Sequence, residues 1–253
     1  IFPFVSANIT YPNSKDLVFK PYVIVDKNDI KIAVIGLSSI FYNATANVLD
    51  PITSLSKIID EIKSESDFVV LLFNANEEDI IKLQNSDIDL DLVIRSKSKS
   101  RSNDGGTKRI PVYSCGDRGK YIYRLNLKLS QSGLEMTDIT SQNNIVTNAQ
   151  KRLDRMKKGD TDINLKDFYK NDQQMLNRIL GYERQLESAQ YQLNNAHNTI
   201  ELYTYELGKT VIDKPSILKI VDKGKEKIAI MKGPQLPDHK GRSSEDPHHG
   251  HNH

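Results

Sequence analysis

The sequence has few cysteines and no long apolar run, and each of these features excludes a class of structure or function. Its 253 residues include no tryptophan and one cysteine, and the longest apolar runs span six residues, far below the ~20 that a membrane-spanning helix needs. We therefore expect no transmembrane segment. A lone Cys115 can form neither an internal disulfide nor a four-thiolate metal site. With 35 basic against 33 acidic side chains, net charge indicates no nucleic-acid partner, and we expect none.

Histidine is almost confined to the end of the chain. Residues 1–196 contain none, and five of the six histidines lie in the last fifteen residues. Catalysis or metal binding that needs imidazole is therefore excluded from residues 1–196, unless another chain supplies it. The terminal cluster would capture Zn, Cu or Ni loosely, although a disordered tail is the interpretation we favour. Its members are His248, His249, His251 and His253.

Residues 1–140 alternate short apolar runs with helical patterns, which is typical of an α/β domain. Residues 22–37 predict a hairpin, and the runs 68–73, 90–94, 110–115 and 121–129 predict further strands. Asp50-Pro51 begins a predicted amphipathic helix, and Asn76 precedes a second, shorter one. Residues 95–109 form a basic loop.

Residues 141–232 predict a helical region, and residues 233–253 a disordered, His-rich tail. Apolar residues recur at heptad spacing over 175–207, which predicts one helix of ~35 residues. The stretch forms either an internal hairpin, with residues 145–156 as one candidate partner, or a coiled-coil surface for a protein partner. We favour the hairpin, and the oligomeric state stays open. The heptad positions are Ile179, Leu186, Leu193, Ile200 and Leu207, with companions Met175, Tyr182, Ala189, Ala196 and Tyr203.

Four segments of the first half resemble the calcineurin-like metallophosphatases of the bifunctional 5'-nucleotidase and cyclic-nucleotide phosphodiesterase type. Residues 2–8 (FPFVSAN) are similar to the family's "fPvlsAN" strand. Residues 19–37 resemble its "f.pY.i…kigviGl" hairpin, residues 89–94 (DLDLVI) its strand before a metal-binding turn, and residues 106–121 its closing "gt.ivq.G..G.ylg.l" segment. These segments occur in the family's order over roughly residues 1–130.

The resemblance implies a metallophosphatase-type α/β sandwich, incomplete at its N-terminus, in an exported bacterial protein, and hence a periplasmic or extracellular location. The family's first metal-ligand motifs precede the "fPvlsAN" strand, so the chain is expected to be a fragment of something longer. The helical half resembles, more faintly, the region that follows this domain in members joined to multihaem cytochromes. The C-x-x-C-H haem motif does not occur in the sequence, and we expect no haem.

The resemblance also implies three histidine ligands, and this sequence replaces all of them. Asn74 stands where the family has a His after its central strand, while Ser96 and Ser98 stand in place of a Gly-His-x-His turn. An Asn carbonyl is a weak ligand for a hard cation, Ser hydroxyls are weaker, and Arg95 and Lys97 would repel a divalent ion. No catalytic, cofactor-binding or intact metal residue is assigned.

We therefore expect a catalytically degenerate metallophosphatase-like pseudoenzyme that serves as a binding or scaffold module. Two alternatives stay open. One is an active phosphoesterase or nucleotidase whose metal pair (Mn, Zn or Ca) is completed by an N-terminal segment outside this chain. The other is a coiled-coil interaction protein that binds a partner through residues 175–207.

Overall fold

The computed structural model describes residues 3–106, 109–130, 134–208 and 210–232. The predicted tail 233–253 with its histidines lies outside the described residues, as do Phe2 and residues 107 and 108 of the resemblance motifs. The chain divides into two compact units, residues 1–207 and 208–253. The domain boundaries predicted at 140 and 232 stay predictions.

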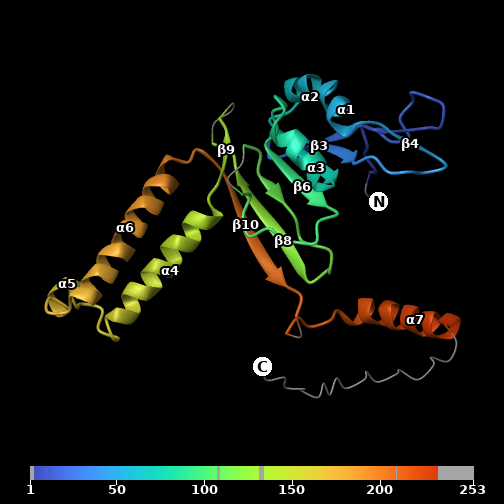
Figure 1. Ribbon diagram of the computed structural model, residues 1–253. Helices are drawn as coiled ribbons and strands as arrows, with labels where there is room; N and C mark the ends of the chain where they lie inside the picture. Colours follow the sequence, from blue (N-terminus) through green and yellow to red (C-terminus); the bar gives the residue numbers. More distant parts are fainter. Residues whose placement is uncertain (1–2, 107–108, 131–133, 209, 233–253) are drawn as a thin grey trace, which may run out of the picture. The chain divides into compact units, whose positions relative to one another are not determined.

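A five-stranded sheet forms the centre of the first unit (Figure 1), with the order β2-β3-β5-β6-β7. Strand β2 is antiparallel to β3, and the other neighbouring pairs are parallel. The predicted hairpin is confirmed, with its turn at Asn28 and Asp29, both at positive φ. The bounds are β2 (Tyr22–Lys27), β3 (Ile30–Ser38), β5 (Phe68–Asn74), β6 (Leu92–Ser96) and β7 (Val112–Tyr113).

Three short helices cover one face of this sheet: α1 (Pro51–Ser56), α2 (Ile59–Glu65) and α3 (Glu77–Gln84). The predicted caps are present, because the side chains of Asp50 and Asn76 accept hydrogen bonds from the backbone N–H groups of Thr53 and Asp79. The single predicted helix after Asp50 is broken into α1 and α2. Leu55, Ile62 and Leu83 are fully buried against the sheet.

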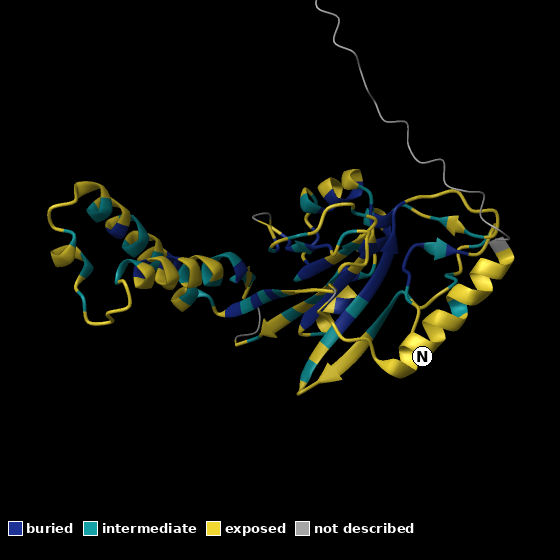
Figure 2. Ribbon diagram, turned by 90° about the horizontal axis from the view of Figure 1, so that it is seen from below, coloured by how far each residue is buried: buried dark blue, intermediate teal, exposed yellow. Residues whose placement is uncertain are grey.

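A second sheet, with the order β8-β10-β9, packs against the other face. Phe68, Val70 and Leu92 of the first sheet meet Ile200 and Leu202 of β10 in one buried cluster. Figure 2 shows that buried segments are concentrated in strands of the first unit. The predicted α/β sandwich is therefore present as a helix layer, a mixed sheet and a smaller sheet. The bounds are β8 (Tyr121–Lys128), β9 (Met136–Asp138) and β10 (Asn198–Glu206).

The prediction of one helix over 175–207 is correct up to Asn195 and wrong for residues 198–206. Helix α6 (Gln173–Asn195) ends at Asn194-Asn195, and residues 198–206 form β10, which pairs along β8. Asn is a poor helix former, whereas Thr199, Ile200 and Tyr203 favour a strand. Ile200 therefore lies in the core between the sheets and not on a heptad seam. The region 141–232 is not all-α.

Helix α6 forms an antiparallel hairpin with α4 (Thr140–Met156), joined through the short helix α5 (Leu165–Phe168). Hydrogen bonds from Gln142 to Gln192 and from Arg152 to Tyr182 fix the direction of the pairing. Ala149 and Leu153 of α4 are buried, as are Ile179 and Ala189 of α6. The internal hairpin favoured from the sequence is present.

The segment before β2 is fixed to the end of β3. The buried side chain of Asn8 donates to the carbonyls of Ser38 and Leu49 at 2.6 and 2.8 Å, and it accepts from the Ser38 N–H at 3.0 Å. A Cβ on Gly36 would lie 2.1 Å from the carbonyl oxygen of Val5. The "fPvlsAN" and "kigviGl" segments thus pack directly on each other. Here β1 (Ile9–Thr10) pairs with β4 (Asn47–Val48).

In the second unit the described structure is one helix, α7 (Pro215–Lys232). Pro215 occupies its first turn, as predicted. Among the described helices of the chain, none has both the length and the apolar character that crossing a bilayer requires.

Candidate functional site

Three polar residues end adjacent strands at the carboxyl edge of the five-stranded sheet. Ser38 is paired with Asn74 between β3 and β5, and Asn74 is paired with Ser96 between β5 and β6. Parallel strands place their last residues side by side, which is why positions far apart in the sequence meet here. In open α/β sheets this is the edge at which ligands bind.

A cleft of about 620 Å³ opens at this edge. Ser38, Asn74 and Ser96 line it together with apolar side chains from the same sheet and from the N-terminal segment. Such a combination of an apolar wall and a few polar groups is usual for a small-molecule site. The large apolar members that are exposed are Phe4, Phe19, Phe41, Leu72 and Ile94.

The apolar wall is exposed because the second sheet does not reach it. Leu72 and Ile94 are register partners on the face that carries Val70 and Leu92, but they lie beyond the contact with β10. Leu72 is 38% exposed and Ile94 41%, whereas Leu92, two residues earlier on the same strand, is 1% exposed. The cleft therefore offers an apolar surface beside the polar strand ends.

The polar side chains at the ends of β5 and β6 are neutral. Asn74 and Ser96 are exposed, and within the described part of the chain their side chains make no hydrogen bond. Ser98, the third predicted position, turns away: its hydroxyl donates to the carbonyl of Ser100, and it does not line the cleft. The structure thus brings together two of the three residues that the resemblance singled out. One amide and one hydroxyl can donate to, and accept from, a bound ligand.

Arg95 supplies a positive charge beside these groups. Its side chain is 12% exposed; its Nε donates to the carbonyl of Ala75 at 3.0 Å, and Nη1 pairs with Glu77 at 2.6 Å. Lys97, next to Ser96, has a positive φ of 62° and is exposed. Because Glu77 neutralises most of the Arg95 charge, the exposed Lys97 is the cation that disfavours a divalent metal and favours an anion here.

Cys115 is a cleft residue that sequence reasoning missed. It is exposed and lines the cleft beside Gly116. Partial burial raises the pKa of its thiol. An isolated antiparallel β-bridge pairs Cys115 with Arg101 across the loop and fixes its position. Local sequence patterns do not predict such a pairing.

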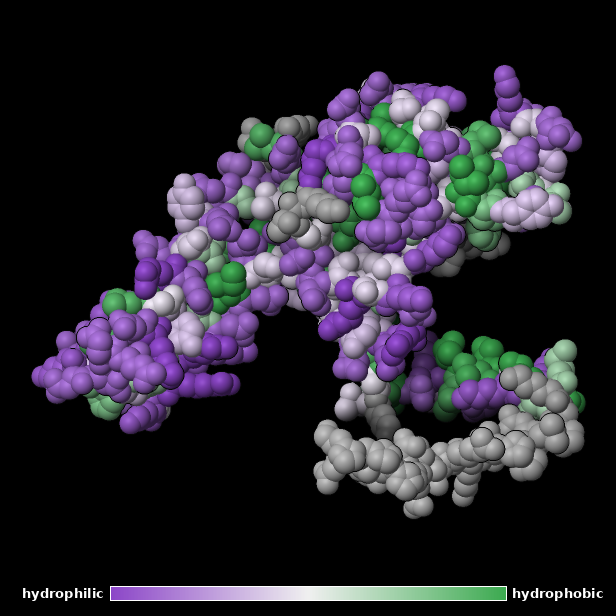
Figure 3. Space-filling model, in the orientation of Figure 1, coloured by the Kyte–Doolittle hydropathy of each residue, from purple (hydrophilic) through white to green (hydrophobic). Residues whose placement is uncertain are grey.

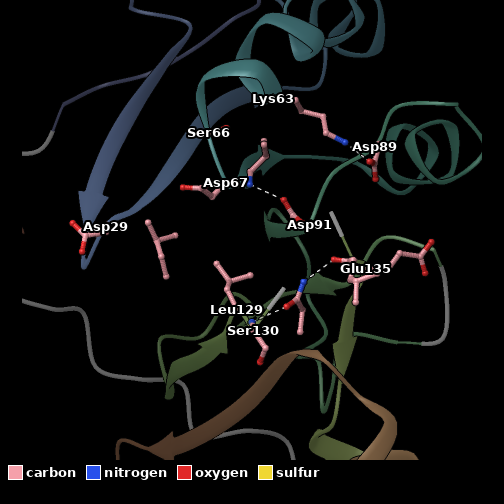
Figure 4. Close-up of a pocket in the computed structure, with 13 residues that line it drawn as sticks. Asp29, Lys63, Ser66, Asp67, Asp89, Asp91, Leu129, Ser130 and Glu135 are labelled. Atoms are coloured by element: carbon pink, nitrogen blue, oxygen red, sulfur yellow. Dashed lines mark hydrogen bonds and ion pairs between the residues drawn. The ribbon is translucent and has the colours of Figure 1, made fainter. Parts of the chain in front are cut away.

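A second cleft, of about 410 Å³, lies at the opposite edge, where the parallel strands begin (Figure 4). Three of the five carboxylates that line it make contacts that stabilise the fold. Asp67 accepts from the Lys31 N–H at 2.9 Å, Asp91 accepts from the Val69 N–H at 2.7 Å, and Asp89 pairs with Lys63. In the residues that the structure describes, no group of three His, Cys, Asp or Glu side chains is arranged to hold a metal ion. The carboxyl-edge cleft is therefore the better candidate.

Comparison with known proteins gives fold similarity alone. No family model and no curated protein matches the chain. Similar solved structures include the sulfate thiohydrolase SoxB of Thermus thermophilus (20% identity, TM-score 0.46, covering 50% of this chain and 25% of that one). A 5'-nucleotidase precursor of Thermus thermophilus has 21% identity and a TM-score of 0.41, and the match covers 51% of this chain and 31% of that one. The NAD nucleotidase of Haemophilus influenzae has 23% identity and a TM-score of 0.35, with 48% of this chain and 26% of that one covered. This chain spans between a quarter and a third of their lengths.

Proposed function

We propose that the chain is part of a 5'-nucleotidase-like metallophosphatase that has lost hydrolysis, and that its carboxyl-edge cleft binds a phosphate ester. The observation that carries the proposal is the pairing of Asn74 with Ser96 at the ends of β5 and β6. Both stand where the sequence resemblance implies histidine ligands, and both present neutral donors to the cleft.

The composition of the cleft supports a phosphate ester such as a nucleotide. Its aromatic and aliphatic wall, including Phe4 and Phe41, suits a base or another apolar group. Asn74 and Ser96 would donate to phosphate oxygens, and the charge of the exposed Lys97 would attract the anion. In this arrangement the residues hold and orient the ester, and none of them is placed to activate water.

The donor set does not fit the pair of divalent cations that the family implies. A two-metal site needs several charged or imidazole ligands to hold ions ~4 Å apart. Among the described residues, the side chains at this edge provide one amide oxygen and neutral serine hydroxyls, with Arg95 and Lys97 nearby. The proposed binding function therefore requires no metal ion.

The motif resemblance also underlies the remaining parts of the proposal. The module belongs to an exported protein with a periplasmic or extracellular location, and it serves binding or scaffolding. The competing function is an active phosphoesterase completed by ligands from another segment. At this edge the amide oxygen of Asn74 would be a better metal ligand than the hydroxyl of Ser96. A protein partner that binds residues 175–207 would contact two different elements, helix α6 and strand β10, because these residues do not form one continuous helix.

Calorimetric titration of the purified chain with a nucleoside monophosphate, in the presence of a chelator, tests the proposal. We expect saturable binding that the double substitution Asn74→Ala with Ser96→Ala weakens by about tenfold or more, because each lost hydrogen bond to a charged group costs roughly 1.5–3 kcal/mol. The matched control is Asn148→Ala on the exposed side of α4. Absence of binding, or equal weakening by the control, would overturn the proposal.

A further inference from the structure

Helix α7 has an apolar face bordered by lysines. At about 100° per residue, Ile217, Val221 and Ile228 fall on one side of the helix, joined by Ile220 and Met231. Lys225 and Lys232 lie along one border of this face, and Lys227 lies along the other. Lysines at these positions can bury their aliphatic stems beside the apolar face and hold their charges at its rim.

The acidic residues of α7 lie on the opposite side. Asp222 and Glu226 fall about 140–180° from Ile217, so the face and its borders carry no negative charge. The helix has five lysines and two acids, a net charge of +3. Within the described residues, the ion pair that involves this helix is loose: Lys225 Nζ lies 3.9 Å from Asp222, and both side chains are more than half exposed. The lysines therefore remain available to an anionic surface.

Nothing in the described part of the second unit covers the apolar face. Ile217 and Ile228 are each 53% exposed and Met231 is 86% exposed, and Figure 3 shows hydrophobic residues gathered along α7. This helix belongs to the second compact unit, residues 208–253. An isolated helix of 18 residues is marginal in water, so the apolar face needs a second surface to remain ordered.

We propose that α7 is an interfacial helix that lies on an anionic phospholipid surface. The apolar face enters the boundary between headgroups and acyl chains, and Lys225, Lys227 and Lys232 contact lipid phosphates from both borders. The acidic side faces water. At 1.5 Å per residue the helix is about 27 Å long and would lie in the membrane plane.

The charge arrangement favours lipid over a second copy of the chain. A dimer through the same face would stack Ile217, Val221, residue 224, Ile228 and Met231 in coiled-coil spacing. Residue 224, at the centre of that seam, is glycine, which provides no side chain to pack, and the bordering lysines of two copies would repel. A lipid surface needs no side chain at this position, and it neutralises the lysines.

Co-sedimentation of the full chain with vesicles tests the proposal. We expect binding to vesicles of phosphatidylcholine mixed with phosphatidylglycerol, little binding to phosphatidylcholine alone, and loss of binding at high salt. Ile228→Asp, at the centre of the apolar face, should weaken binding by about tenfold or more. Ile230→Asp makes the same chemical change on the water-facing side, where Ile230 is 80% exposed, and should bind like the unsubstituted chain.

Three results would overturn the proposal. The first is no sedimentation with anionic vesicles. The second is equal behaviour of the two isoleucine variants, which would move the lipid contact to another surface, such as the basic loop 95–101. The third is a molecular mass in analytical ultracentrifugation that doubles with concentration and returns to that of one chain in Ile228→Asp, which would assign the face to a second copy.

Discussion

Asn74 and Ser96 are register partners at the last positions of β5 and β6, so two neutral polar side chains stand together at the carboxyl edge of the sheet. Their adjacency is a consequence of parallel pairing, since 22 residues separate them in the chain. The apolar pair Leu72 and Ile94 precedes them on the same face and is left exposed. This grouping is the structural basis of the proposed binding cleft.

Gly36→Ala should destabilise the first unit by about 3 kcal/mol or more, because the added Cβ would lie 2.1 Å from the Val5 carbonyl oxygen and 2.7 Å from its carbon. Urea denaturation measures the loss. The matched control is Gly181→Ala inside α6, where a Cβ meets nothing within 4 Å; it should stabilise by about 0.5–1 kcal/mol. Equal effects at the two glycines would contradict the packing of the N-terminal segment on β3.

Tyr113→Phe should loosen the contact between the two sheets. The Tyr113 hydroxyl, on β7, donates to Asp138 of β9 at 2.6 Å, and burial together with Asp138 raises its pKa, so it remains a donor at every ordinary pH. We expect a loss of about 1–3 kcal/mol in the free energy of unfolding. Tyr191→Phe, at a residue that is 71% exposed, is the control and should change stability little. If both variants unfold alike, the hydrogen bond does not stabilise the sandwich.

Asp91→Asn should change how stability depends on pH. Burial raises the pKa of Asp91, and the nearby Asp89 raises it further. Between the ordinary carboxyl value and the raised value, the folded state binds more protons than the unfolded state, so stability falls as pH rises through this window. Asparagine removes that decline and retains an acceptor for the Val69 N–H. Thermal unfolding at a series of pH values from acid to neutral measures how stability depends on pH, and Asp87→Asn, at an exposed residue, is the control. If stability depends on pH in Asp91→Asn as it does in the unsubstituted chain, the raised pKa of Asp91 is refuted.

Cys115 should report ligand binding at the cleft. Because burial raises the pKa of its thiol, alkylation by iodoacetamide should be slower at neutral pH than for a free cysteine, and it should accelerate as pH rises. A nucleoside monophosphate should slow the reaction by covering the cleft. The chain has no other cysteine, so the label is unambiguous. In urea the ligand should give no protection; protection that persists there, or none in the folded protein, would place the ligand elsewhere.

Local patterns were sufficient for much of the first half of the fold. Continuous β-branched runs predicted β3, β5 and β6, and Asp50 and Asn76 predicted helix starts that the structure contains. The one large error was β10, because apolar residues spaced by seven fit both a helix stripe and a strand whose alternate residues are buried. Pairing with β8, a contact 70 residues away or more, decides the conformation there.

The candidate site was predictable only in part. The resemblance singled out Asn74 and Ser96, and their pairing in the sheet places both in one cleft. Ser38 and Cys115 were missed because they reach the cleft through strand register and a loop bridge, which depend on tertiary contacts. Ser98 was included by motif position, although its hydroxyl is used within its own turn.

Metal content and turnover of the purified chain test the central claim most directly. The chain is equilibrated in turn with Mn, Zn and Ca, and bound metal is measured together with hydrolysis of a nucleoside monophosphate and a phosphodiester. The account predicts no turnover and no metal whose binding depends on Asn74, while the nucleotide still binds in the presence of a chelator. Two ions bound per chain, with turnover that Asn74→Ala abolishes, would contradict it and restore an active phosphoesterase.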